Sequence, residues 1–212
     1  MAVQNNHVLI FDFDGTIADT FHCLVNIGNR LSKEFHFKKI KADEIEFLKG
    51  KNVQETIRHL NIPLLKIPMI VARAKQELNK NIALIKPIGG LKGVLRQLKN
   101  LKHKMGILTS NSLKNVTGFL DNHGLNFFDF IQTTSKIWSK NKSLLTLANN
   151  QALKIADMIY IGDETRDIIA AQKAGIRCAA VTWGYNTSRT LEAHQPDFLI
   201  HSPRDLFELF RI

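Results

Sequence analysis

The stretch FDFDGT, residues 11–16, follows the apolar residues 8–10 directly. A short apolar run that ends in an aspartate is typical of a buried parallel strand whose carboxyl end reaches a polar crevice. Asp12 and Asp14 would point to the same side of an extended strand, so the spacing predicts two converging carboxylates. Such like charges need a cation or a proton between them. The alternative interpretation is an ordinary turn, with aspartate as a helix cap.

A second acidic stretch favours the cation. GDETRD, residues 162–167, also follows an apolar run, so carboxylates stand at the ends of two predicted strands. Magnesium prefers oxygen ligands and typically takes one or two carboxylates together with water and substrate phosphate. We therefore expect Asp163 to complete a Mg2+ site with Asp12.

Strand and helix patterns alternate from residue 86 to the end of the chain. The predicted strands after residues 8–13 are 105–109, 128–133, 158–162, 178–182 and 198–200. The predicted helices between them are 91–100, 115–122, 142–150 and 167–174. This order predicts an α/β fold: a Rossmann-like parallel sheet with helices on both faces and a ligand crevice beyond the carboxyl ends of its strands.

The region from about residue 20 to residue 83 has helical periodicity and no convincing strand. Pro63 and Pro68 must interrupt it, because proline lacks a backbone donor and clashes with a preceding helical turn. We expect several short helices here. The predicted division is an α/β catalytic core of residues 1–18 and 86–212 and an inserted all-α cap domain of residues 19–85.

Composition narrows the range of functions. The formal net charge of +10 is spread along the chain without a dense basic run, so it favours attraction of a small anion over nucleic-acid binding. The two cysteines form no disulfide framework, and no apolar run is long enough to cross a bilayer. We expect a cytoplasmic protein with no membrane partner, as a monomer or a homodimer.

The acidic stretches resemble two motifs of the haloacid dehalogenase superfamily of phosphohydrolases. Its first motif, DxDGT, matches residues 12–16, and its fourth, GDxxxD, matches residues 162–167. The second motif, a Thr or Ser that closes a strand, resembles Ser110. Either Lys140 or Lys142 could supply the lysine of the third motif, and we favour Lys140, because Trp138-Ser139-Lys140 takes the place of a Phe-Gly-Lys segment. The resemblance extends from residue 8 to about residue 209. Within the superfamily, the chain resembles the phosphoglycolate phosphatase-like branch.

The resemblance implies a role for each acid. Asp12 is the expected nucleophile and becomes transiently phosphorylated, and Asp14 protonates the leaving group and later activates water. The implied Mg2+ ligands are Asp12, the main-chain carbonyl of Asp14, and Asp163. Asp167, rather than Glu164, is expected to hold metal-bound water or to orient the lysine.

Other residues are expected to contact the substrate. The resemblance implies that Ser110, a neighbouring backbone amide and Lys140 donate hydrogen bonds to phosphate oxygens, with Thr16 and Asn111 beside them. The helical insertion resembles a mobile cap that closes over the site and supplies specificity. Within it, Lys49 and Gly50 form a turn that either approaches the anionic substrate or is an ordinary helix connection.

Three functions remain open at this point. The leading hypothesis is a Mg2+-dependent phosphatase that hydrolyses a small phosphorylated metabolite, with 2-phosphoglycolate as one candidate. The alternatives are a sugar phosphomutase that uses the same aspartyl phosphate and a non-catalytic basic binding module. Dehalogenation is not expected, because dehalogenases of the superfamily lack an acid at the position of Asp14.

Overall fold

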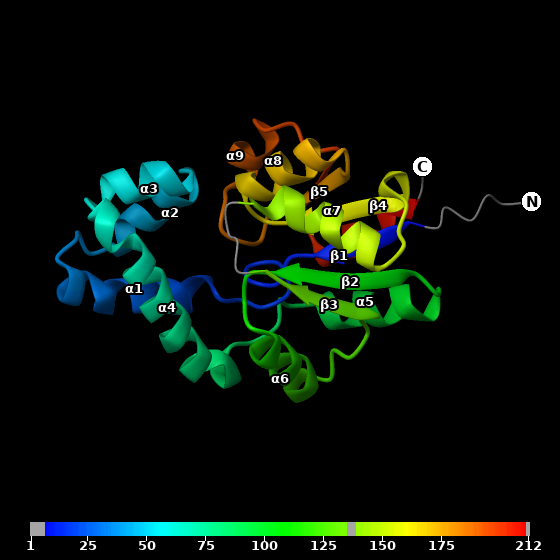
Figure 1. Ribbon diagram of the computed structural model, residues 1–212, viewed down its shortest axis with the longest axis horizontal. Coiled ribbons are helices and arrows are strands. Elements are labelled where there is room, and N and C mark those ends of the chain that lie inside the picture. Colours follow the sequence, from blue (N-terminus) through cyan, green and yellow to red (C-terminus); the bar gives the residue numbers. More distant parts are fainter. Residues whose placement is uncertain (1–6, 135–138, 211–212) are drawn as a thin grey trace, which may run out of the picture.

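The computed structural model of the chain describes residues 7–134 and 139–210. Six parallel strands form one sheet in the order β3-β2-β1-β4-β5-β6, which confirms the predicted α/β fold (Figure 1). The strands are β1 (Val8–Phe11), β2 (Lys104–Thr109), β3 (Phe130–Thr133), β4 (Met158–Gly162), β5 (Arg177–Val181) and β6 (Phe198–Ile200). The strand order reverses between β1 and β4, and open sheets of this kind bind ligands beyond the carboxyl ends of the strands at that point.

Strand β1 lies inside the sheet because all four of its side chains are apolar and buried. Leu9 and Phe11 join the hydrophobic core on one face, and the two alternate residues join the core on the other. Backbone pairing sets Phe11 opposite Ile107 of β2 and Ile161 of β4. The residues that follow β1 and β4 are therefore brought together at one edge of the sheet.

Helices cover both faces of the sheet. Side chains of α5 and α6 pack in the first core, and side chains of α7 and α8 pack in the second. The helices that follow the insertion are α5 (Leu91–Asn100), α6 (Leu113–His123), α7 (Lys140–Asn150), α8 (Thr165–Ala174) and α9 (Ser188–Glu192), with the 3-10 helices η5 (Ile155–Asp157) and η6 (Pro203–Phe210). Both α7 and α8 start earlier than predicted.

The first predicted strand extends too far, since β1 stops at Phe11. Beyond it the chain turns: the amide of Ala18 donates to the carbonyl oxygen of Phe13 at 2.9 Å. Asp12 and Asp14 therefore both lie beyond β1, and Asp14 forms an isolated bridge with Ala18. The expected convergence of their two carboxylates stays a prediction.

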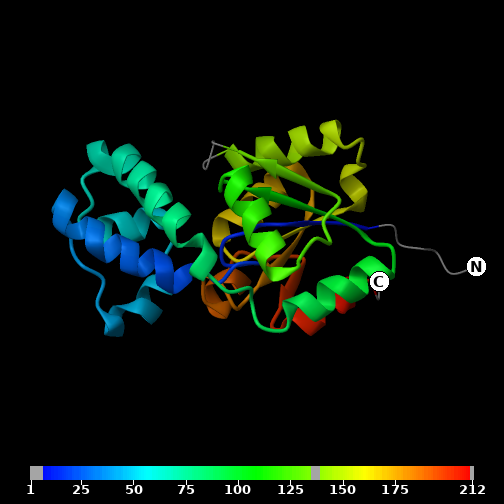
Figure 2. The same cartoon turned by 90° about the horizontal axis from the view of Figure 1, so that it is seen from below.

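The segment between β1 and α5 contains only helices, as predicted, and lies beyond the carboxyl end of the sheet (Figures 1 and 2). Its helices are α1 (Phe21–Phe35), α2 (Ile45–Lys49), α3 (Val53–His59) and α4 (Ile67–Asn81), with the 3-10 helices η1 (Ala42–Glu44), η2 (Leu64–Lys66) and η3 (Ile82–Leu84). Pro63 precedes η2, and Pro68 lies in the first turn of α4. Both prolines therefore stand where a helix begins, where the missing donor costs least.

The chain enters and leaves this insertion at adjacent points. The amide of Asp19 donates to the carbonyl oxygen of Lys86 at 2.9 Å, and the amide of Ile88 donates to that of Ile17 at 2.9 Å. Two neighbouring chain crossings are the arrangement expected of a hinge. The exact division into a core of residues 1–18 and 86–212 and a cap of residues 19–85 stays a prediction.

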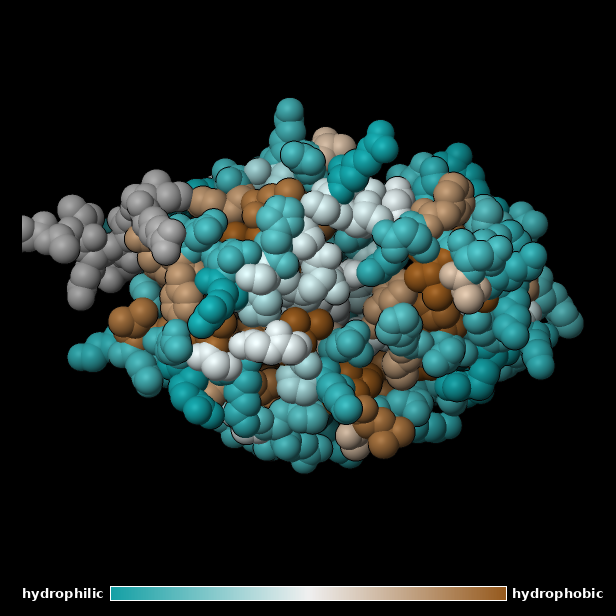
Figure 3. All heavy atoms as spheres, turned by 180° about the vertical axis from the view of Figure 1, so that it is seen from behind, coloured by the Kyte–Doolittle hydropathy of each residue, from teal (hydrophilic) through white to brown (hydrophobic). Residues whose placement is uncertain are grey.

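The surface is largely hydrophilic on the face opposite that of Figure 1, with separate hydrophobic patches (Figure 3). Within the described residues, no helix combines the length and the apolar character needed to cross a membrane.

A histidine cluster lies at the amino end of the sheet, away from the strand ends that carry the acids. An Arg177 nitrogen lies 2.9 Å from Nδ1 of His7, and the His103 ring stacks on Phe210 with centroids 3.8 Å apart. Burial and the Arg177 guanidinium lower the pKa of His7, and burial lowers the pKa of His103. Both rings therefore resist protonation in the folded protein.

We expect His7→Gln to weaken the acid sensitivity of the fold. The unfolded chain protonates His7 near its ordinary pKa of 6.5, whereas the folded chain does so only at lower pH, so His7 costs stability as pH falls through that value. The free energy of unfolding of His7→Gln, measured with urea, should thus improve relative to wild type between about pH 7.5 and 5.5. His22→Gln, at an exposed position, is the control, and parallel pH profiles for wild type and His7→Gln would contradict the assignment.

Candidate active site

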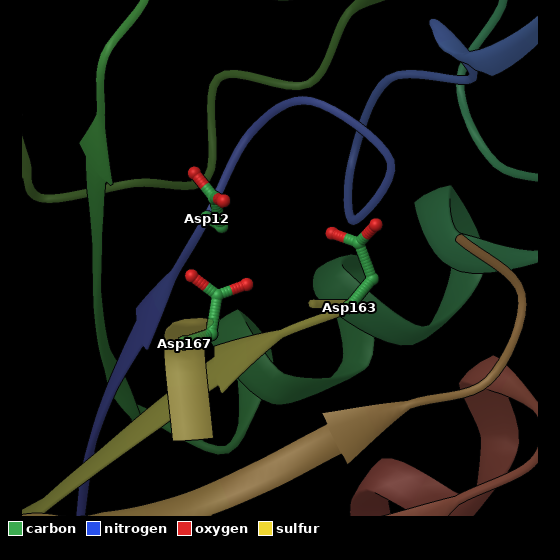
Figure 4. A group of neighbouring side chains, drawn as sticks. All are labelled: Asp12, Asp163 and Asp167. Atoms are coloured by element: carbon green, nitrogen blue, oxygen red, sulfur yellow. The ribbon is translucent and has the colours of Figure 1, made fainter. Parts of the chain in front are cut away.

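Three buried aspartates converge where β1 and β4 end (Figure 4). Asp12 follows β1, Asp163 follows β4, and Asp167 lies in the first turn of α8. One carboxylate oxygen of each lies within 4.8 Å of the others. The structure thus brings together the acids of the two stretches that the sequence analysis singled out, although about 150 residues separate them in the chain.

A single buried lysine joins two of these acids. Lys140, at the start of α7, donates to Oδ2 of Asp12 at 2.6 Å and to Oδ1 of Asp167 at 2.5 Å. Lys142, two residues further along the helix, is exposed. Of the two lysines weighed from the sequence, the structure places Lys140 at the cluster. Trp138, which supported that choice, lies outside the described residues.

Asp163 is held by neutral donors. Its Oδ1 accepts from the Thr16 hydroxyl at 2.7 Å, and its Oδ2 accepts from the Tyr185 amide at 2.8 Å. Two glycines allow this close approach: a Cβ at Gly15 or at Gly184 would lie 2.2 Å from Oδ2 of Asp163. Gly15 also has a φ of 79°, which favours glycine.

The cluster fits a divalent cation. Burial raises the pKa of Asp12 to about 7, despite the opposing effect of Lys140, and raises the pKa of Asp163 well above its ordinary value. Burial therefore disfavours the charged form of both carboxyls unless a nearby positive charge balances it. Carboxylate oxygens are the ligands that hard divalent cations prefer, and a bound cation would supply the missing positive charge.

Asp14 is not one of the three acids of this cluster. Its two carboxylate oxygens each lie 3.3 Å from Nδ2 of Asn111, which follows β2. Burial raises its pKa to about 6, while the Asn111 amide and the Thr20 hydroxyl act in the opposite direction. The carboxylate of Asp14 is thus separate from the three acids that could hold a cation, and the predicted ligand role of its main-chain carbonyl stays a prediction.

The predicted substrate contact of Thr16 stays a prediction. The residue is 1% exposed, and its hydroxyl is committed to Asp163. Ser110 is half-buried beside Asn111, at the end of β2, in the position that the sequence predicts for a phosphate contact. Its carbonyl oxygen accepts from Nζ of Lys75, a residue of α4, at 3.0 Å.

A cavity of about 660 Å³ lies between the insertion and the core. On the core side its lining includes Lys140, Thr165 and Tyr185, and on the insertion side it includes Phe21 and Lys49. Nζ of Lys49 lies over the Phe21 ring, 4.8 Å from its centroid. Gly50 is the residue after α2 and belongs to the turn that the sequence analysis proposed as a substrate contact.

Several residues of this region were missed by the sequence analysis. Lys75 lies in a helical insertion where a lysine is indistinguishable from a solvated one, so no local signal marks it. The Tyr185 amide and the Asn186 side chain act through partners distant in sequence. The one available signal was the glycine at position 184, two residues after the end of a predicted strand.

This fold and this site define a class: α/β enzymes that act on an anionic substrate at the carboxyl ends of a parallel sheet, with carboxylates and a buried lysine as the reactive groups. Residues 9–181 match the family described as haloacid dehalogenase-like hydrolase. The chain belongs to this family.

Individual relatives agree with this family assignment. The phosphoglycolate phosphatase of Synechococcus elongatus is 32% identical over 201 residues, which cover 94% of this chain and 95% of the relative. The pyrophosphatase PpaX of Bacillus cereus is 24% identical over 209 residues, covering 96% and 95%. A haloacid dehalogenase-like hydrolase from Streptococcus pneumoniae has the same fold, with a TM-score of 0.82 at 22% identity over 97% of this chain and 99% of that one. The chain is a phosphatase of this family.

We expect Mg2+ to stabilise the protein through Asp163. A cation at 100 times its Kd adds about 2.7 kcal/mol, which for a chain of this size corresponds to a rise in Tm of roughly 5–10 °C. Asp163→Asn should abolish this rise, because it removes a carboxylate that would bind the cation. Thermal unfolding with and without MgCl2 measures the rise. Asp121→Asn, at an exposed aspartate of α6, should keep the full rise, and a Mg2+-induced rise that survives Asp163→Asn would contradict the site.

Proposed function

We propose that this phosphatase is Mg2+-dependent and hydrolyses a small phosphomonoester through a phosphorylated Asp12. The observation that carries the proposal is the environment of Asp12. This buried carboxylate lies at the meeting point of the acid cluster, with one oxygen bound by Lys140 and the other accepting from the Phe13 amide at 2.8 Å. A carboxylate fixed in this way is oriented for attack on an anionic substrate.

Asp12 and Asp163 would hold the magnesium ion, with Asp167 next to them. When bound, the ion would neutralise charge that otherwise drives Asp12 and a phosphate apart. Lys140 keeps Asp12 ionised and in place through its hydrogen bond to Oδ2, and Asp167 orients that lysine from the other side. Thr16 and the Tyr185 amide fix the Asp163 carboxylate.

In the first chemical step an oxygen of Asp12 forms a bond to phosphorus and the bond from phosphorus to the leaving oxygen breaks. Asp14 gives its proton to that oxygen, which departs as an alcohol. In the second step Asp14 takes a proton from water as the water attacks the phosphorus, which releases inorganic phosphate and restores Asp12. Asn111 holds the Asp14 carboxylate. Ser110 and Lys140 would donate to the phosphate oxygens.

The relatives support two substrates for a first panel. Their names include a phosphoglycolate phosphatase, at 32% identity, and a pyrophosphatase, at 24%. We propose 2-phosphoglycolate as the leading substrate, because the more similar relative carries that name. Comparison of kcat/KM for 2-phosphoglycolate, pyrophosphate and hexose phosphates tests the choice. Isomerisation of a hexose phosphate without release of inorganic phosphate would favour a phosphomutase instead.

Asp14→Asn should separate the two chemical steps. Nitrophenolate leaves p-nitrophenyl phosphate without needing a proton, so Asp12 can still be phosphorylated, whereas release of phosphate from Asp12 needs the base that the variant lacks. Stopped-flow absorbance should therefore show a burst of about one nitrophenolate per chain, followed by turnover slower by about two orders of magnitude.

Asp12→Asn is the matched control and should show neither burst nor turnover. A burst of equal size from Asp12→Asn would exclude Asp12 as the nucleophile. Full steady-state activity of Asp14→Asn would exclude Asp14 as the acid and base.

A further inference from the structure

The loop after β5 touches both the acid cluster and the helical insertion. Tyr185 holds Asp163 through its amide, and its hydroxyl lies 2.7 Å from the hydroxyl of Thr20, where the insertion begins. The next residue, Asn186, is 6% exposed and has no role in the proposed chemistry. A buried amide side chain needs hydrogen-bond partners, so its contacts are informative.

Asn186 connects two parts of the molecule. On the core side, its backbone amide donates to the carbonyl oxygen of Asp163 at 3.2 Å, and its Oδ1 accepts from the Thr165 amide at 2.9 Å. On the insertion side, its Nδ2 donates to the carbonyl oxygens of Lys49 at 2.8 Å and of Lys51 at 3.2 Å. One side chain thus bonds to the start of α8 and to the turn between α2 and α3.

The bonds to the insertion go to its main chain. They depend on where the turn of residues 49–51 lies, and not on which side chains it carries. The amide of Thr187 adds a third bond, to the carbonyl oxygen of Lys49 at 3.1 Å. These bonds exist only while the turn lies against the core. Covalently, the insertion is joined to the core only at the two chain crossings near residues 19 and 86.

We propose that Asn186 is a positioning residue that holds the 49–51 turn of the insertion against the loop that carries Asp163. The Nδ2 donor holds the turn closed, and the Oδ1 acceptor holds the side chain on α8. The closed turn covers the cavity that Lys140 and Tyr185 line. The expected effect on catalysis rests on the proposed phosphatase function, whereas the effect on the turn does not.

Asn186→Asp tests the assignment. Aspartate keeps the acceptor for the Thr165 amide, but it has no donor and sets a carboxylate against two carbonyl oxygens. The matched control is Asn29→Asp. The Asn29 side chain also bonds main-chain groups through both of its polar atoms, but within the insertion. Its Nδ2 donates to the carbonyl oxygen of Ile40 at 2.9 Å, and its Oδ1 accepts from the Ile40 amide at 2.7 Å.

Hydrogen–deuterium exchange and steady-state kinetics on the full chain are the two readouts. In Asn186→Asp, amide exchange over residues 46–56 should rise at least about tenfold, and kcat/KM for p-nitrophenyl phosphate should fall by about tenfold, since a misplaced element near the reacting atoms has this scale of effect. The Mg2+-induced rise in Tm should persist, because Asp163 keeps its hydrogen bonds from the Thr16 hydroxyl and the Tyr185 amide. Asn29→Asp should leave exchange over residues 46–56 and kcat/KM within twofold of wild type.

Unchanged exchange over residues 46–56 in Asn186→Asp would overturn the proposal. Loss of the Mg2+-induced rise in that variant would also overturn it, because Asn186 would then act on the Asp163 loop and not on the turn. Raised exchange with intact Mg2+ binding supports it. If wild type itself releases no phosphate from any substrate, the proposed function fails, and the exchange measurement still decides the role of Asn186.

Discussion

The structure depends on the burial of several negative charges at one edge of a parallel sheet. Asp12, Asp163 and Asp167 share a space less than 5 Å across, and one buried lysine offsets them only in part. Such an arrangement is tolerated only where the surrounding loops supply donors and leave room. The absence of a side chain at Gly15 and at Gly184 follows from this constraint, because a Cβ at either position would collide with Asp163.

The sheet supplies the rigidity that this charge cluster requires. The side chains of β1 pack in a hydrophobic core on each face of the sheet, and backbone pairing places its carboxyl end beside the carboxyl-terminal parts of β2 and β4. The carboxylates of the cluster consequently start from main-chain positions that have little freedom to move. The turn after Phe13 then gives the two aspartates of the first motif different surroundings: Asp12 contacts Lys140, and Asp14 contacts Asn111. Different surroundings are what allow two neighbouring carboxyls to perform different chemistry.

The insertion is attached to this rigid base differently. Covalently it is connected by two adjacent chain crossings, and some of its apolar side chains, such as Ile27 and Leu78, belong to the first hydrophobic core. It touches the strand-end loops through polar contacts, among them Lys75 to the carbonyl oxygen of Ser110 and Asn186 to the turn of residues 49–51. Individual hydrogen bonds of this kind contribute about 1 kcal/mol each, far less than the apolar packing that holds the sheet.

Apolar periodicity and the position of acids after apolar runs were enough to predict the parallel sheet, the helical insertion and the meeting of Asp12 with Asp163, because these features follow from local patterns and from the common direction of parallel strands. The sequence did not determine that β1 ends at Phe11, before the first aspartate, or that the buried Thr16 hydroxyl donates to Asp163. The sequence narrowed the candidates for the buried lysine to Lys140 and Lys142, and the tertiary structure places Lys140 at the acid cluster. Tyr185, Lys75 and Asn186 emerged only from the tertiary structure. Their partners lie in segments tens to more than a hundred residues away, and no local pattern records which distant backbone groups a side chain will meet.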